Sequence, residues 1–309
     1  MRIVFFGSPG SALPSLQALI GEGHSIELVV TQPDRPSGRG KKTKPCPVKE
    51  YASRKGIPAY QPHRIRKDPE AENRLREAAP DVNVVVAYGQ IIPGPLIYLP
   101  RYRSLNVHFS LLPAYRGASP VQWAILNGES ETGVTIIELN EKMDEGDILA
   151  VERAAVRPGE TASELQDRLA LLGARLLVET LAGIDALETR PQDHSRATYA
   201  PLIRKEDGRI DWTQKADRIE RMVRAFTPWP TAFGHLGGRR LIVVSGQAED
   251  SASPGQPGEI LSSSKEGIRV VCGAATVFRI ESLQPENRRP MPAYSYWLGA
   301  RMRLGDRWG

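Results

Sequence analysis

The chain has 309 residues, of which 40% are hydrophobic and 25% are charged, the composition of an ordinary soluble globular protein. The sequence contains no apolar run near the roughly 20 residues that a membrane-spanning helix needs, and its short apolar start ends at Gly7. The two cysteines, Cys46 and Cys272, fit no metal-ligand spacing. We therefore expect a cytosolic protein whose thiols are reduced.

The first half of the chain alternates strand-like and helix-like segments. Arg2–Phe6 is a short apolar run that ends in glycine, which is typical of a buried parallel strand. Further strands are predicted at Ile26–Val30, Val82–Ala87, Leu105–His108 and Val134–Leu139, with helices around Leu13–Ile20 and Pro120–Leu126. This alternation predicts an α/β fold, a Rossmann-like open sheet of parallel type with helices on both faces.

The pattern changes after a longer helix in which Leu165, Leu169, Leu172 and Leu176 repeat on one face behind a Thr161–Glu164 capping box. Residues 190–207 are polar and irregular, and short β-like runs separated by Gly, Pro and Ser follow. We therefore predict a catalytic domain at residues 1–189, a linker at 190–207 and a small antiparallel barrel or sandwich at 208–309.

The positive charge is unevenly distributed. Residues 208–309 hold 15 basic and 10 acidic side chains, whereas the residues before them hold 26 of each. A basic appended domain can hold a polyanion through phosphate contacts, although a solvated basic face has the same composition.

The segment SLNVHFSLLPAYRGASP contains the first candidate for catalysis. On a strand at Leu105–His108, Asn106 and His108 point to the same face and lie near the carboxyl end, where open α/β sheets bind ligands. An amide donor beside an imidazole suits acyl transfer, because both can bind an oxyanion and histidine can move a proton. A structural histidine at a strand end is the alternative.

A carboxylate near His108 would orient the ring and favour its charged form. The loop NEKMDEGDIL, which follows the strand at Val134–Leu139, offers four candidates. They are Glu141, Asp144, Glu145 and Asp147, and their spacing does not distinguish among them.

The run from Leu105 to Leu149 resembles the core signature of folate-dependent formyltransferases. The resemblance implies that the N-x-H residues Asn106 and His108, with Asp144 of the D-x-G-D loop, carry out catalysis. It also implies that 10-formyltetrahydrofolate is the formyl donor and that no metal takes part. The residues that it assigns to folate binding are Ser110, Leu111, Leu112, Pro113, Tyr88 and Gly89.

The acceptor is indicated by other segments. FFGSPGSALPSL and Thr31–Pro62 resemble the corresponding parts of formyltransferases that act on methionyl initiator tRNA, as do Tyr199–Trp212, Arg224–Phe233 and the closing GDRWG. In that family a basic loop enters the acceptor-stem region, which implies tRNA contacts by Arg35, Arg39, Lys41, Lys42 and Lys44. The resemblance covers nearly the whole chain and implies an OB-like second domain that grips tRNA, and a monomeric enzyme.

Three alternatives stay open. A formyltransferase for a sugar nucleotide or for glycinamide ribonucleotide would share the catalytic residues but would not need the basic loop. A non-catalytic RNA-binding protein would not need Asn106, His108 and Asp144. A nucleotide-dependent oxidoreductase is disfavoured because the chain lacks G-x-G-x-x-G after its first strand.

Overall fold

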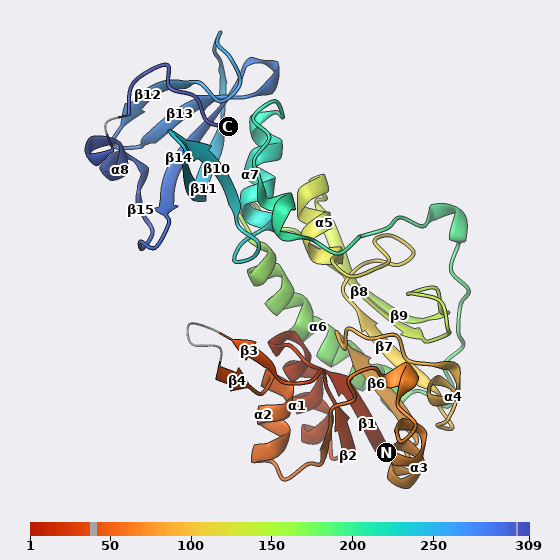
Figure 1. Ribbon diagram of the computed structural model, residues 1–309. Coiled ribbons are helices and arrows are strands. Elements are labelled where there is room, and N and C mark those ends of the chain that lie inside the picture. Colours follow the sequence, from red (N-terminus) through yellow and green to blue (C-terminus); the bar gives the residue numbers. More distant parts are fainter. Residues whose placement is uncertain (38–41, 301) are drawn as a thin grey trace. The chain divides into compact units, whose positions relative to one another are not determined.

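The computed structural model describes residues 1–37, 42–300 and 302–309 (Figure 1). The chain forms two compact units. The first comprises residues 1–120, 131–155 and 166–201, and the second comprises residues 121–130, 156–165 and 202–309.

A seven-stranded sheet in the order β5-β2-β1-β6-β7-β8-β9 forms the centre of the first unit (Figure 1). The first five strands in this order, β5, β2, β1, β6 and β7, are parallel to one another. Strand β8 is antiparallel to β7, and β9 is antiparallel to β8. The strands are β1 (Arg2–Gly7), β2 (Ser25–Val30), β5 (Ala59–Tyr60), β6 (Val82–Val86), β7 (Ser104–His108), β8 (Glu131–Glu138) and β9 (Ile148–Ala155).

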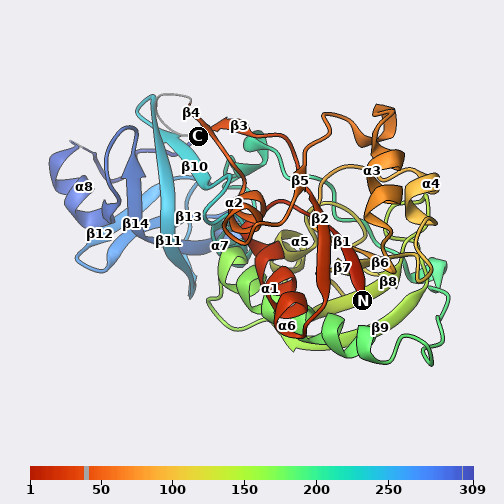
Figure 2. The same cartoon turned by 90° about the horizontal axis from the view of Figure 1, so that it is seen from below.

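Helices cover both faces of this sheet, so its central strands are buried on both sides. Val4 and Phe6 of β1 pack in one cluster with side chains of α3 and α4, and the intervening residues Ile3 and Phe5 are buried on the opposite side, where α1 lies (Figure 2). The helices and 3₁₀ turns are η1 (Gly10–Ala12), α1 (Leu13–Gly21), α2 (Pro47–Arg54), η2 (Ile65–Lys67), α3 (Ala71–Ala78), α4 (Gly94–Ile97), α6 (Ala162–Ala182) and η3 (His194–Arg196).

These features confirm the predicted Rossmann-like class, with some differences in detail. The strand predicted at Val134–Leu139 is β8, which runs antiparallel to the rest, and β9 was not predicted. The sequence ILAVERAA alternates buried and partly exposed positions at the edge of the sheet, so it lacks the continuous apolar run of a central strand. The predicted capping box is present, since the Thr161 N–H donates to Glu164 Oε2 over 2.9 Å.

The second unit is built on an antiparallel sheet with the strand order β10-β11-β14-β13-β12, and β15 pairs with β14. Its strands are β10 (Ala232–Leu236), β11 (Arg239–Ala252), β12 (Ile260–Ser264), β13 (Gly267–Val271), β14 (Thr276–Pro285) and β15 (Met291–Pro292). Its helices and 3₁₀ turns are α5 (Pro120–Asn127), η4 (Lys205–Gly208), α7 (Ala216–Ala225), η5 (Gly273–Ala275) and α8 (Ala293–Gly299). The predicted antiparallel second domain is thereby confirmed.

The last residues of the chain join the two edge strands of this sheet. His235 of β10 exchanges backbone hydrogen bonds with Gly309, and Ile260 of β12 donates its N–H to the Asp306 carbonyl over 2.9 Å. Trp308 lies between them and is 4% exposed, with its ring centroid 5.6 Å from that of Trp212. The sheet is therefore closed by the C-terminal segment, as a barrel requires.

Candidate active site

Strand β7 presents two polar side chains on one face and an apolar one on the other. The side chain of Val107 lies against α6, where Gly173 leaves room: a Cβ on that glycine would stand 2.8 Å from a Val107 methyl carbon. Asn106 and His108 therefore point to the opposite face. Asn106 is half-buried, and the His108 side chain is 7% exposed.

Asp144 lies beside both of these side chains. Its Oδ1 atom is 3.4 Å from Asn106 Nδ2 and 3.6 Å from His108 Nδ1, and its Oδ2 accepts the Gly117 N–H over 2.8 Å. Of the four acidic candidates in the loop, Asp144 is thus the one in contact with Asn106 and His108. The three residues predicted to be catalytic meet at the carboxyl end of β7.

The His108 ring is held between two oxygen atoms. Its Nε2 atom lies 3.0 Å from the backbone carbonyl oxygen of Tyr115, which can only accept, so Nε2 carries a hydrogen. Its Nδ1 atom then faces Asp144 at a distance longer than an ordinary hydrogen bond. The Tyr115 carbonyl therefore fixes the orientation of the imidazole as much as the carboxylate does.

The predicted folate segment Ser110–Pro113 follows β7 and is held by Thr135 of β8. The buried Thr135 hydroxyl donates to the Ser110 carbonyl over 2.7 Å and accepts the Leu112 N–H over 3.1 Å. The Ser110 hydroxyl donates to the Ala114 carbonyl over 2.6 Å. This segment is consequently fixed next to the strand that carries Asn106 and His108.

The other two predicted folate residues line a depression of about 600 Å³. Tyr88 and Gly89 follow β6, the neighbour of β7, and a φ of +80° at Gly89 lets the chain turn there. The segment Lys44–Pro47 forms another part of the wall, so Lys44 of the predicted tRNA-binding set borders the same depression. Cys46 lies in that wall as well.

Two parts of the predicted tRNA-binding loop form a two-stranded sheet of β3 (Arg35–Ser37) and β4 (Lys42–Lys44). Arg35 and Lys42 belong to these strands and Lys44 is exposed, whereas Arg39 and Lys41 lie outside the described residues. Sequence reasoning missed the polar network just before β3. Lys49 Nζ donates to Asp34 Oδ2 over 2.6 Å and Gln61 Nε2 donates to Asp34 Oδ1 over 2.8 Å, which lowers the pKa of the Asp34 carboxyl.

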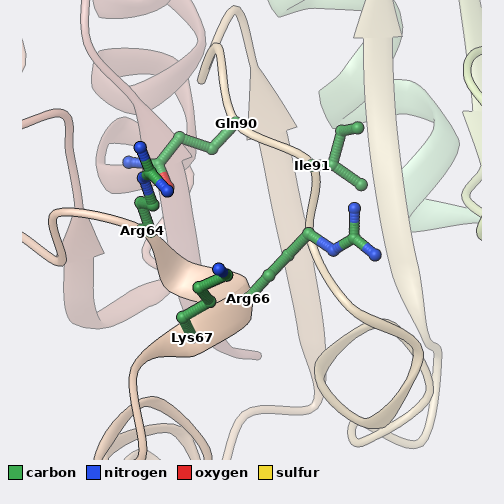
Figure 3. A pocket seen from close by; sticks show the side chains of 5 residues that line it. All are labelled: Arg64, Arg66, Lys67, Gln90 and Ile91. Carbon is green, nitrogen blue, oxygen red and sulfur yellow. The ribbon is translucent and has the colours of Figure 1, made fainter.

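A second depression, of about 450 Å³, is lined by Arg64, Arg66, Lys67, Gln90 and Ile91 (Figure 3). The Gln90 side chain fixes the backbone on both sides of Arg64, since Oε1 accepts the Ile65 N–H over 2.8 Å and Nε2 donates to the Pro62 carbonyl over 3.1 Å. Three basic residues within the sequence RIRK were the available signal for this feature, and the sequence analysis did not single them out.

Two buried polar residues behind Asp144 were also missed. Arg116 is 1% exposed and donates through Nε and Nη2 to Gln192 Oε1, over 3.1 and 2.7 Å. Gln192 in turn donates to the carbonyls of Asp144 and Gly146, over 2.9 and 2.7 Å. Nothing in the sequence around Gln192 marked it, because residues 190–207 were predicted to be a linker.

Within the described residues, no group of three or more His, Cys, Asp and Glu side chains has the arrangement of a metal site. None of the helices in that part of the chain combines the length and hydropathy of a membrane-crossing segment.

Comparison with known proteins finds relatives along the whole chain, in agreement with the family resemblance of its sequence motifs. A family model described as formyl transferase matches residues 1–181, and one described as formyl transferase, C-terminal domain, matches residues 202–301. The chain is 44% identical to the methionyl-tRNA formyltransferase of Geobacter metallireducens, over 100% of this chain and 99% of the relative. It is 45% identical to that of Myxococcus xanthus, over 99% of this chain and 97% of the relative.

Solved structures share the fold at low sequence identity. HypX from Aquifex aeolicus in complex with tetrahydrofolic acid superposes with a TM-score of 0.65 at 18% identity, over 100% of this chain and 50% of that one. The sugar 3N-formyl transferase WlaRD, in the presence of dTDP and 5-N-formyl-THF, gives a TM-score of 0.66 at 17% identity, over 94% and 99%.

Proposed function

The chain belongs to the formyl transferase family, and we propose that it transfers a formyl group from 10-formyltetrahydrofolate to the free amino group of methionyl initiator tRNA. The observation that carries this function is the full-length similarity to methionyl-tRNA formyltransferases, which includes both domains. Asn106, His108 and Asp144 supply a donor, an imidazole and a carboxylate where such a transfer needs them.

In the proposed reaction the lone pair of the deprotonated methionine amine forms a bond to the formyl carbon, and the carbonyl electrons move onto oxygen. The tetrahedral intermediate then collapses: the bond to the folate nitrogen breaks, that nitrogen gains a proton, and the amine nitrogen loses one. Asn106 donates to the oxyanion, because its amide has two hydrogens and only one faces Asp144.

His108 and Asp144 act as a pair in this proposal. His108 lies beside the reacting atoms with its Nε2–H held by the Tyr115 carbonyl, and Asp144, next to Nδ1, relays protons toward the departing folate nitrogen. The Tyr115 carbonyl occupies Nε2 and Asp144 lies beside Nδ1, so Asn106 is the more accessible direct donor to the oxyanion, and His108, beside Asp144, serves the proton transfers.

Both substrates are placed at the carboxyl edge of the first unit's sheet. The folate lies along Ser110–Pro113 and beside Tyr88 and Gly89, and the acceptor end of the tRNA is held by the basic loop of Arg35, Arg39, Lys41, Lys42 and Lys44. The closed antiparallel sheet, which we take to be an OB-like barrel, grips the tRNA with the excess of basic residues in 208–309.

The domain limits of 1–189 and 208–309, the cytosolic location and the monomeric state belong to the same proposal. A cytosolic enzyme meets charged tRNA directly, and the barrel and the basic loop come from one chain, so no second copy is needed. Light scattering of the purified protein tests the oligomeric state, and a dimer mass would contradict it.

The test of function is formyl transfer from 10-formyltetrahydrofolate to purified methionyl initiator tRNA, with uncharged tRNA and a His108→Ala variant as controls. Transfer that requires both the aminoacyl group and His108 supports the acceptor and the mechanism together. Transfer to an amino sugar nucleotide or to glycinamide ribonucleotide, with none to the charged tRNA, would overturn the acceptor and keep the formyl transfer.

A further inference from the structure

Residues 190–200 do not run free of the first unit but pair with the loop that follows β7. The Arg116 N–H donates to the Thr198 carbonyl over 2.9 Å, the Ala200 N–H donates to the Arg116 carbonyl over 2.7 Å, and the Tyr115 N–H donates to the Thr198 hydroxyl over 2.9 Å. This loop supplies the Tyr115 carbonyl that holds His108 and the Gly117 N–H that holds Asp144.

The side chain of Gln192 connects this segment to the backbone of the loop that carries Asp144. Its amide nitrogen donates both hydrogens, one to the Asp144 carbonyl and one to the Gly146 carbonyl, and the residue is 5% exposed. An amide of glutamine can rotate to exchange its oxygen and nitrogen, which would set its oxygen against these two carbonyls.

Arg116 prevents that exchange. Its guanidinium has only donors, and two of them meet Gln192 Oε1, so the oxygen of Gln192 must face Arg116 and its nitrogen must face the loop. The same guanidinium lies 3.5 Å from the Glu145 carboxylate, which balances its buried charge. The chain Arg116–Gln192–loop backbone therefore has one self-consistent hydrogen-bond arrangement.

The loop needs such support because its backbone is unfavourable. Asp144 adopts a φ of +54°, a left-handed conformation that is unfavourable for a residue other than glycine. Gly146 runs so close to the neighbouring chain that a Cβ there would overlap the Glu138 carbonyl. Without the two bonds from Gln192, relaxation of this backbone would turn the Asp144 carboxylate away from His108 and Asn106.

We propose that Arg116 and Gln192 are positioning residues for formyl transfer, which hold the Asp144 carboxylate in place through the backbone of its loop. This inference rests on the proposed function. It adds these two residues to the support of the site, although neither contacts the reacting atoms.

The test compares Gln192→Glu and Gln192→Ala in the full-length enzyme. Glutamate keeps the size and the acceptor for Arg116 but places an oxygen against the two carbonyls, and alanine removes the donors to them. Both variants should therefore lower kcat by on the order of 10- to 100-fold, the cost of a misplaced catalytic group. KM for both substrates changes by less than about threefold, because substrate contacts stay intact. The matched control is Asp193→Asn: Asp193 caps the adjacent turn by accepting from Ser195, and this variant is expected to keep wild-type kcat.

A double-mutant cycle with Asp144→Ala separates positioning from general stability. If Gln192 acts through Asp144, Gln192→Ala causes less than about a threefold further loss of kcat when Asp144 is already absent. Undiminished kcat in Gln192→Glu, or full additivity of Gln192→Ala with Asp144→Ala, would overturn the inference. The proposed function would still stand if the wild-type enzyme transfers the formyl group. Absence of transfer by the wild type would instead defeat the proposed function.

Discussion

Nδ1 of His108 lies 3.6 Å from Oδ1 of Asp144, and the same carboxylate oxygen is 3.4 Å from the amide nitrogen of Asn106. One carboxylate oxygen thus orients both of the groups that we assign to catalysis. The arrangement has a practical consequence: replacing any of the three side chains changes the environment of the other two, so their effects on rate should not be additive.

We expect Asn106→Ala to lower kcat by on the order of 100- to 1,000-fold, the usual cost of one oxyanion donor. Donor binding should persist, because the amide is used in the transition state. Single-turnover transfer of labelled formyl to charged tRNA measures this directly. Turnover near the wild-type rate would remove Asn106 from the mechanism, and equal loss of folate binding would make it a substrate-binding residue instead.

Thr135→Val should loosen the segment Ser110–Pro113. The substitution keeps the shape of the side chain but leaves the Ser110 carbonyl and the Leu112 N–H without their shared partner, which costs about 1–3 kcal/mol. We expect a lower denaturation midpoint and a raised KM for the folate donor, with KM for tRNA unchanged.

Thr132→Val is the matched control on the same strand. The Thr132 hydroxyl is buried and has no hydrogen-bond partner among the described residues, so its removal should be neutral or stabilising. Equal destabilisation by the two substitutions would show that the Thr135 hydroxyl does not hold the segment.

The sequence predicted the parts of the site that depend on local pattern. Strand alternation placed Asn106 and His108 on one face of β7, and that placement follows from periodicity alone. Asp144 was different: its contact with them depends on a left-handed backbone and on the antiparallel turn between β8 and β9, neither of which a hydropathy pattern encodes. Only the resemblance to a known family distinguished it from Glu141, Glu145 and Asp147.

Arg116 and Gln192 could not be predicted because their role is entirely tertiary. They are separated by 76 positions, and each is a polar residue in a segment whose composition indicates a loop. Their exposed fractions of 1% and 5% are what mark them as structural residues. The burial of isolated polar residues in loops cannot be inferred from their neighbours in sequence. The same holds for the final residues of the chain, which complete the second unit's sheet.

The two cysteines should react at very different rates with iodoacetamide. Burial raises the pKa of the Cys272 thiol to about 12, and the residue is 1% exposed, so its reactive thiolate is scarce and shielded. Cys46 is partly exposed and lines the depression beside Tyr88 and Gly89. Mass spectrometry of the native protein should find Cys46 labelled first and Cys272 only after unfolding, and early labelling of Cys272 would contradict its burial.

Asp34 should make the folded state sensitive to acid. Its carboxyl has a pKa below the ordinary 3.8 because it accepts hydrogen bonds from Lys49 and Gln61, so its ionised form stabilises the folded state above that value. This stabilisation is lost as the pH falls through the lowered pKa. The Tm difference between wild type and Asp34→Asn should therefore be largest near neutral pH and shrink below about pH 4. A difference that grows on acidification would contradict this sign.

Trp308 should be essential to the second unit although it is the penultimate residue. Its backbone pairs with Gly258 and its ring packs on Trp212, while a Cβ on Gly234 would stand 2.9 Å from the indole. Truncation to alanine removes a buried aromatic side chain and opens the contact between β10 and β12, at a cost of about 3–5 kcal/mol.

All five tryptophans fall within the residues of the second unit, so indole fluorescence during urea denaturation reports on that unit. We expect Trp308→Ala to lower the midpoint of this transition strongly, and Trp229→Ala, at a residue that is 56% exposed, to leave it nearly unchanged. Similar midpoints for the two variants would mean that the C-terminal segment merely covers a sheet that is stable without it. A selective effect of Trp308→Ala would mean that closure of the barrel, and with it the surface proposed to hold tRNA, depends on the last residues of the chain.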